Sequence, residues 1–225
     1  MLIFGGPTWP IGWGVGYLKR PYEDVRLAFG DWYDELRFES RWIDLDDMSL
    51  LDMLRRLAPI QGTYTRHLIV QTVGPWTACF DNSQLGGDQA SWVGYLSRRL
   101  DCEAILATHV PRGQYRLPAT QFQLLGPNGA QPLRYVRTIS AGIFDEGRWR
   151  FDVSGAPQPF EDVAAYSRRL IRDRFTRDML LNYLRSHGIS ADDPSFYRNG
   201  SIIEDVRPWT NEGSSIEGAQ RRYAR

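Results

Sequence analysis

Four consecutive segments in the middle of the chain alternate polar and apolar residues, and this alternation constrains the fold more than any other feature. The segments are 102–110, 120–125, 133–139 and 148–153. Successive side chains of a strand point to opposite faces, so a strand with one buried face has a period of two. The links Gly126-Pro-Asn-Gly129 and Asp145-Glu-Gly147 are typical of turns. The sequence therefore predicts an antiparallel meander.

Apolar residues at helical spacing occur on both sides of this meander. After Pro21, the residues Val25, Phe29, Trp32 and Leu36 recur three or four positions apart and form one apolar stripe. The same spacing, together with residues that favour helix ends, predicts further helices. The expected helices run from Pro21 to about Leu36, from Asp46 or Asp47 to Pro59, over about 88–100, over 161–172, and from Thr176 to Gly188.

The helix that begins at Thr176 carries the most complete set of end signals. Thr176 is a favourable N-cap, and Phe175 before it and Leu180 after it match the hydrophobic staple. Gly188 followed by Ile189 matches the glycine that ends many helices and the apolar contact that accompanies it. We therefore expect this helix to have well-defined ends.

A hairpin is expected ahead of the meander. The segments 67–73 and 76–80 are rich in apolar and β-branched residues, and Gly74-Pro75 between them favours a turn. Residues 37–43 are typical of a further short strand.

The two ends of the chain lack a clear period. Residues 1–20 are rich in Gly, Pro and Trp and are predicted to be irregular. The chain beyond Asp192 is predicted to form an arm over the domain, with a flexible tail at 213–225. The order of elements predicts a single α+β domain over residues 1–212, with a mainly antiparallel sheet and helices packed on it.

Charge and cysteine content exclude some classes of function. The chain has 27 basic and 27 acidic residues, so as a whole it attracts neither nucleic acid nor an acidic membrane. No segment approaches the roughly 20 apolar residues of a membrane helix, and no signal peptide is recognisable. Cys79 and Cys102 fall in apolar segments and are expected to be reduced. We expect a cytoplasmic protein, with export by a specialised system left open.

The densest group of polar residues lies in the strand–loop–helix segment from Trp76 to Asp88. Asp81 and Asn82 follow a strand, and two glycines precede Asp88, which opens a helix. A ligand loop is one interpretation, and His109 near Asp81 would then supply an acid–base pair. An Asx turn and a helix cap are the structural alternative. The spacing matches no metal motif, and we expect neither a metal nor a cofactor.

A second group of candidates is the arginine cluster of residues 168–177. Arg169 and Arg172 are its candidate binding residues, while interspersed acidic residues dilute its positive field. A solvated surface is one interpretation. Binding of an acidic protein or of RNA is the other, although the aromatic residues show no pattern typical of base stacking.

Two stretches of the chain resemble a known class of proteins. The first is Gly74-Pro-Trp-Thr-Ala-Cys-Phe-Asp-Asn82 with Gly-Gly-Asp88. The second runs from Phe151 to Gly188 and includes Pro-Gln-Pro-Phe-Glu and Arg-Phe-Thr. Both resemble uncharacterised bacterial proteins encoded beside polymorphic toxins. The resemblance implies an immunity protein that binds a cognate toxin, and it assigns no catalytic residue.

Three hypotheses for function follow. The first is a non-enzymatic immunity or antitoxin protein that occludes the active site of a protein partner through a large surface. The second is a small enzyme or ligand-binding protein with a site at Asp81, Asp88 and His109. The third is an RNA-associated protein that uses the arginines at 168–177. The sequence shows no serine-hydrolase elbow and no activated cysteine, which favours the first. It leaves the oligomeric state open.

Overall fold

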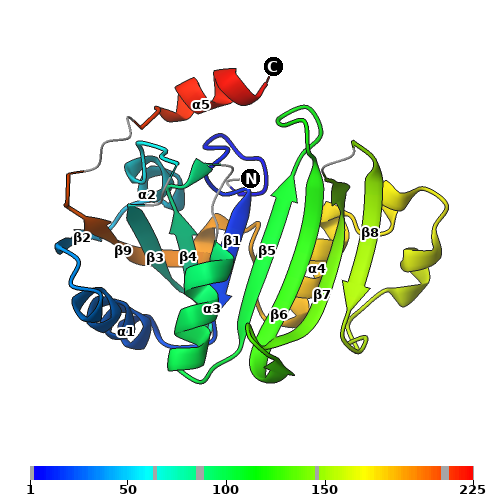
Figure 1. Cartoon of the computed structure of the whole chain (residues 1–225), viewed down its shortest axis with the longest axis horizontal. Coiled ribbons are helices and arrows are strands. Elements are labelled where there is room, and N and C mark those ends of the chain that lie inside the picture. Colours follow the sequence, from blue (N-terminus) through cyan, green and yellow to red (C-terminus); the bar gives the residue numbers. More distant parts are fainter. Residues whose placement is uncertain (1–2, 63–64, 85–88, 145–146, 209–212, 225) are drawn as a thin grey trace.

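One antiparallel sheet runs through the molecule from end to end (Figure 1). The computed structural model describes residues 3–62, 65–84, 89–144, 147–208 and 213–224. Within them the strand order is β2-β9-β3-β4-β1-β5-β6-β7-β8. The strands are β1 Gly14–Leu18, β2 Ser40–Leu45, β3 Arg66–Thr72, β4 Thr77–Asp81, β5 Ala104–Val110, β6 Ala119–Ala130, β7 Tyr135–Ile143, β8 Trp149–Ser154 and β9 Tyr197–Asp205. This architecture confirms the predicted α+β class.

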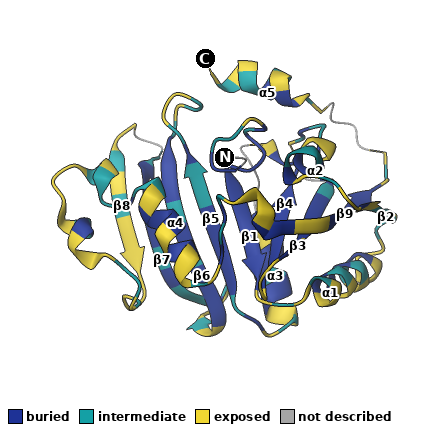
Figure 2. Ribbon diagram, turned by 180° about the vertical axis from the view of Figure 1, so that it is seen from behind, coloured by how far each residue is buried: buried dark blue, intermediate teal, exposed yellow. Residues whose placement is uncertain are grey.

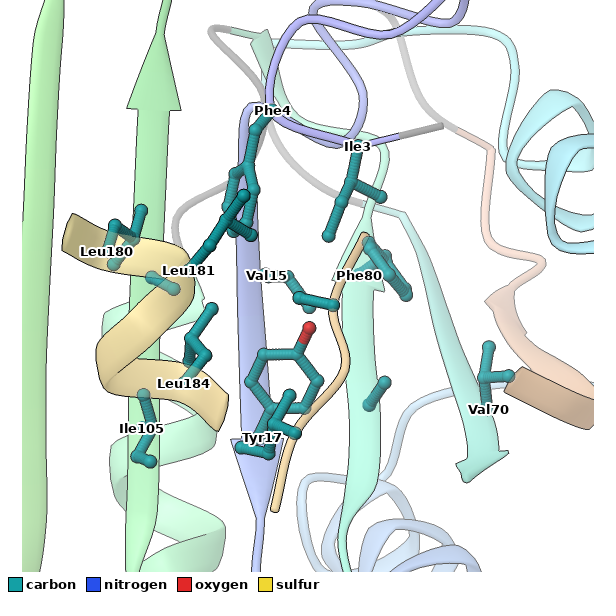
Figure 3. Packing of buried hydrophobic residues seen from close by; sticks show 14 of the residues in the cluster. Ile3, Phe4, Val15, Tyr17, Val70, Phe80, Ile105, Leu180, Leu181 and Leu184 are labelled. Atoms are coloured by element: carbon teal, nitrogen blue, oxygen red, sulfur yellow. The ribbon is translucent and has the colours of Figure 1, made fainter. Parts of the chain in front are cut away.

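The helices pack on both faces of this sheet. They are α1 Tyr22–Glu35, α2 Leu50–Arg56, α3 Gln89–Arg99, α4 Arg177–Ser186 and α5 Ile216–Tyr223. Helices α1 and α3 bury their apolar residues against one face, together with Leu18 and Cys79. Helices α2 and α4 and the N-terminal loop cover the other face, as Figures 2 and 3 show from behind and from close by. There Leu180, Leu181 and Leu184 of α4 join the core that contains Tyr17.

The prediction of an irregular N-terminus was wrong for residues 14–18. These residues form β1, which pairs with β4 on one side and β5 on the other and lies at the centre of the sheet. All five residues of this strand are buried. A strand that is buried on both faces has no polar and apolar alternation, so its signal is lost among the neighbouring glycines.

The predictions for the C-terminal part also need correction. Residues 197–205 form β9, which is inserted between β2 and β3 instead of lying over the domain as an arm. The expected flexible tail contains α5, which Ser215 caps and which buries Ile216 and Ala219. The Gln220 side chain donates to the backbone oxygens of Pro7 and Trp9, so α5 is tied to the N-terminal loop.

The meander and the hairpin are confirmed, with one change at a turn. Strands β5 to β8 pair in sequence, and β3 pairs with β4. The predicted turn at 126–129 is instead part of β6, which continues to Ala130, and the chain turns at 131–134. The register of β6 against β7 shifts there, which accommodates the glycine-rich end of the strand.

Helix α4 has the predicted ends. Thr176 Oγ1 accepts a hydrogen bond from Met179 N, and Phe175 and Leu180 are both buried. Gly188 has φ +76°, and Ile189 N donates to Leu184 O, which is the Schellman pattern.

Two other helix predictions were wrong. Ser49, not Asp46 or Asp47, caps α2, because Asp47 adopts a left-handed turn conformation with φ +57°. Residues 161–172 form two short 3-10 turns, 163–167 and 171–173, instead of one helix. The buried Glu161, held by Arg137, keeps this segment along the outer strands of the sheet.

Gly16 of β1 provides a direct test of how closely α3 packs on the sheet. A Cβ atom at this position would lie 2.7 Å from Val93 Cγ2. We expect Gly16→Ala to lower the free energy of unfolding in urea by about 1–3 kcal/mol through overpacking. Gly30→Ala is the matched control, because its added Cβ meets only Trp42 Nε1, at 3.6 Å, and a helix favours alanine. Equal effects of both changes would contradict this packing.

Candidate functional site

Asn82, a predicted ligand residue, has a structural role. Its side-chain oxygen accepts from the backbone N–H groups of Thr65 and Arg66, at 2.9 and 3.0 Å. Its amide nitrogen donates to Pro59 O and to Thr65 Oγ1. These bonds use the hydrogen-bonding capacity of a fully buried side chain. Asn82 therefore joins three chain segments and does not face a ligand.

Asp81 and Trp76 are also buried within the fold. The Asp81 carboxylate accepts from Ser83 N at 3.0 Å and from Trp92 Nε1 of α3 at 3.1 Å. The Ser83 bond is the Asx turn that the structural alternative predicted. Trp76 donates from its indole nitrogen to His187 O at the end of α4. Asp88 lies outside the described residues.

The predicted acid–base pair of Asp81 and His109 is not formed. Asp81 bonds to α3, on the face that α1 and α3 cover. His109 lies on β5, with Thr120 opposite it on β6, and lines a cleft together with residues that precede and begin α4. The sheet thus separates the two side chains. The pairing prediction failed because strand ends that are near in the sheet can still point to opposite faces.

The structure brings His109 and Arg172 together in one cleft of about 180 Å³. We call it the arginine cleft. Its polar and aromatic lining consists of His109, Arg112, Thr120, Trp149, Arg172, Asp173, Thr176 and Arg177. Arg169, predicted beside Arg172, does not line the cleft and is exposed to solvent.

The environment of His109 keeps its imidazole neutral. Burial lowers its pKa to about 4, and the positive charge of Arg177 contributes in the same direction. The Nδ1 atom lies 3.0 Å from Thr120 Oγ1, within hydrogen-bond distance. His109 is therefore an uncharged polar group among arginines at neutral pH.

A second surface, at the opposite end of the sheet, was missed by the sequence reasoning. Residues 22–52 contain ten acidic residues and three arginines. Nine of the ten acidic side chains are exposed: Glu23, Asp24, Asp31, Asp34, Glu35, Glu39, Asp44, Asp46 and Asp47. These residues belong to α1, β2 and the adjoining turns, and we call this region the acidic surface. A count of charge in successive windows would have found it, whereas the balanced total conceals it.

Leu27 lies in the middle of the acidic surface. It is 67% exposed, the most exposed large apolar side chain among the described residues. Its neighbours one turn away on α1 are Glu23, Asp24, Gly30 and Asp31. The Arg26–Asp44 ion pair of 2.6 Å ties this helix to β2, an edge strand. An apolar centre within a charged rim is typical of a protein-binding surface.

Comparisons with known proteins give no identification: neither a family model, nor a curated protein, nor a solved structure matches the chain. In the described part of the chain, no group of three or more His, Cys, Asp or Glu side chains is placed to hold a metal ion. None of the described helices has the length and apolar content needed to cross a membrane.

The charge environment of His109 can be tested by NMR. We expect the His109 ring to titrate near pH 4, well below the ordinary value of 6.5. The unfolded chain then takes up the proton first, so this group lowers stability as the pH falls from 6.5 towards 4. Arg177→Gln removes a positive charge and should raise the pKa of His109. An unchanged pKa in this variant, or a wild-type value near 6.5, would refute this description of the cleft.

Proposed function

We propose that the protein is a non-enzymatic binding protein that uses its acidic surface to occlude the cationic active site of a protein partner. Its biological class would be that of immunity or antitoxin proteins, as the sequence resemblance implies. The observation that carries this proposal is the concentration of exposed carboxylates around Leu27 on α1.

The acidic surface has a net charge that its own ion pairs do not neutralise. Nine exposed acidic residues face three arginines within residues 22–47, a difference of six charges in a chain with no net charge. Arg99 of α3 supplies one cation from outside, at 2.8 Å from Glu35. Such a surface attracts a basic partner and accelerates their association. Proteins that act on nucleic acids carry basic surfaces of this kind.

Leu27 supplies an apolar contact, which the charged residues around it do not provide. Salt screens the attraction between exposed charges. Most of the binding energy at a protein interface comes from a few desolvated residues near its centre. Leu27 is exposed on α1, and Gly30, about one turn further along the helix, has no side chain that could cover it. A partner that covers Leu27 would bring its cationic groups within reach of Asp24 and Asp31.

The two alternative functions have less support. A site made of Asp81, Asp88 and His109 lacks its central pair, because Asp81 and His109 lie on opposite faces of the sheet. The arginines at 168–177 are divided between the arginine cleft and the solvent. Trp149 is the single aromatic residue among the described residues that line this cleft, whereas single-stranded nucleic acid stacks its successive bases on several aromatic side chains.

The proposal predicts which surface residues a partner needs. The triple variant Asp24→Asn, Leu27→Ala, Asp31→Asn should lose binding at least tenfold, or about 1.4 kcal/mol. The double variant Arg168→Gln, Arg169→Gln changes exposed residues at the other end and should bind like the wild type. Tagged forms of all three proteins would be used to capture partners from the native host. Affinity for the purified partner would then be measured by calorimetry at low and high salt.

We expect a basic partner that binds the wild type and the control with equal affinity. The wild type should block the enzymatic activity of this partner at a one-to-one ratio. Binding that survives in the triple variant would refute the acidic surface as the site. Binding without inhibition of the partner's activity would refute occlusion of an active site.

A further inference from the structure

The arginine cleft gathers positively charged side chains that have no role in the proposed function. Arg112, Arg172 and Arg177 contribute three positive charges to a space of about 180 Å³. Asp173 also lines the cleft and lies 3.8 Å from Arg172, so the charged side chains of the lining have a net charge of plus two. Asp178, which does not line the cleft, lies 3.5 Å from Arg177. Each of these pairs joins sequence neighbours, and Asp178 is 87% exposed, so solvent weakens its contribution.

Helix α4 adds to the positive potential of the cleft. Thr176, its N-cap, and Arg177, its first residue, both line the cleft. The N-terminus of a helix carries a partial positive charge and backbone N–H groups without partners inside the helix. The guanidinium groups and the helix end therefore favour the same kind of ligand. Arg guanidinium groups bind carboxylates and phosphates through paired hydrogen bonds.

A buried ion pair fixes the segment that brings Arg172 to the sheet. Glu161 accepts from Nε and Nη2 of Arg137 on β7, and the two side chains are 0% and 3% exposed. The Tyr166 hydroxyl and the backbone N–H of Gln158 donate to the same carboxylate. This anchoring holds residues 155–173 against the outer strands. A pre-formed site loses less entropy when a ligand binds.

The polar residues on the sheet complete the site. His109 and Thr120 lie on neighbouring strands and are joined by a hydrogen bond of 3.0 Å. Trp149 of β8, which β7 separates from β6, lines the same cleft and offers an aromatic surface beside the charges. From these observations we propose that the arginine cleft binds a small oxyanion, namely the phosphate or carboxylate group of a small ligand.

The test is a titration of the protein with sodium sulfate, which keeps its charge over the working pH range. Chemical shifts of the His109 ring and the Trp149 indole would be followed by NMR at pH 7 and low ionic strength. We expect saturable shifts in the wild type and at least tenfold weaker binding in Arg112→Gln, Arg172→Gln. The control Arg221→Gln, Arg222→Gln removes two exposed charges of α5, outside the cleft, and should bind sulfate like the wild type.

Linear shifts without saturation, or an equal loss in the control variant, would overturn the proposal. A titration with sodium acetate separates the two sources of the ligand group. Tighter binding of sulfate supports a phosphorylated ligand, and tighter binding of acetate supports a carboxylate. His109→Gln gives a second variant, expected to weaken binding without any change in cleft charge. The triple variant of the acidic surface should bind sulfate normally, so failure of one proposal does not decide the other.

Discussion

The backbone hydrogen bonds of β1 hold the two halves of the molecule together. This five-residue strand pairs with β4 on one side and with β5 on the other. Without it the sheet would divide into the group β2-β9-β3-β4 and the meander β5 to β8. Its Gly16 allows α3 to approach the sheet, and its Tyr17 faces α4. The cores on both faces of the sheet therefore meet at β1.

Features that depend on local sequence were predictable, and those that depend on distant pairing were not. The meander, the hairpin and the ends of α4 follow from alternation, turn residues and capping residues, all within a few positions. Strand β9 pairs with β2 and β3, more than 120 positions away in the sequence. Its sequence is polar at the start, and Gly200 is required where a Cβ would lie 2.8 Å from Met53 Sδ. Neither property is typical of a central strand.

The candidate site shows the same limit. Asp81 and Asn82 attracted attention as polar residues at a strand end, yet burial and saturated hydrogen bonds give them a structural role. The sequence could not show on which face of the sheet His109 lies relative to Asp81. The sequence did contain the excess of acidic residues in the segment 22–52. The totals of 27 basic and 27 acidic residues for the whole chain do not show this excess.

The length of the sheet decides whether that asymmetry has physical consequences. Strands lie about 4.8 Å apart, so the two edges of a nine-stranded sheet are separated by roughly 38 Å along the sheet. The Debye length at physiological ionic strength is about 8 Å. The acidic surface at the β2 end and the arginine cleft near the β8 end therefore do not cancel each other, although the chain as a whole is neutral (Figure 1). The charge at each end therefore acts on a ligand independently of the other end, so the two proposed ligands, a basic protein and a small anion, would not compete for the same surface.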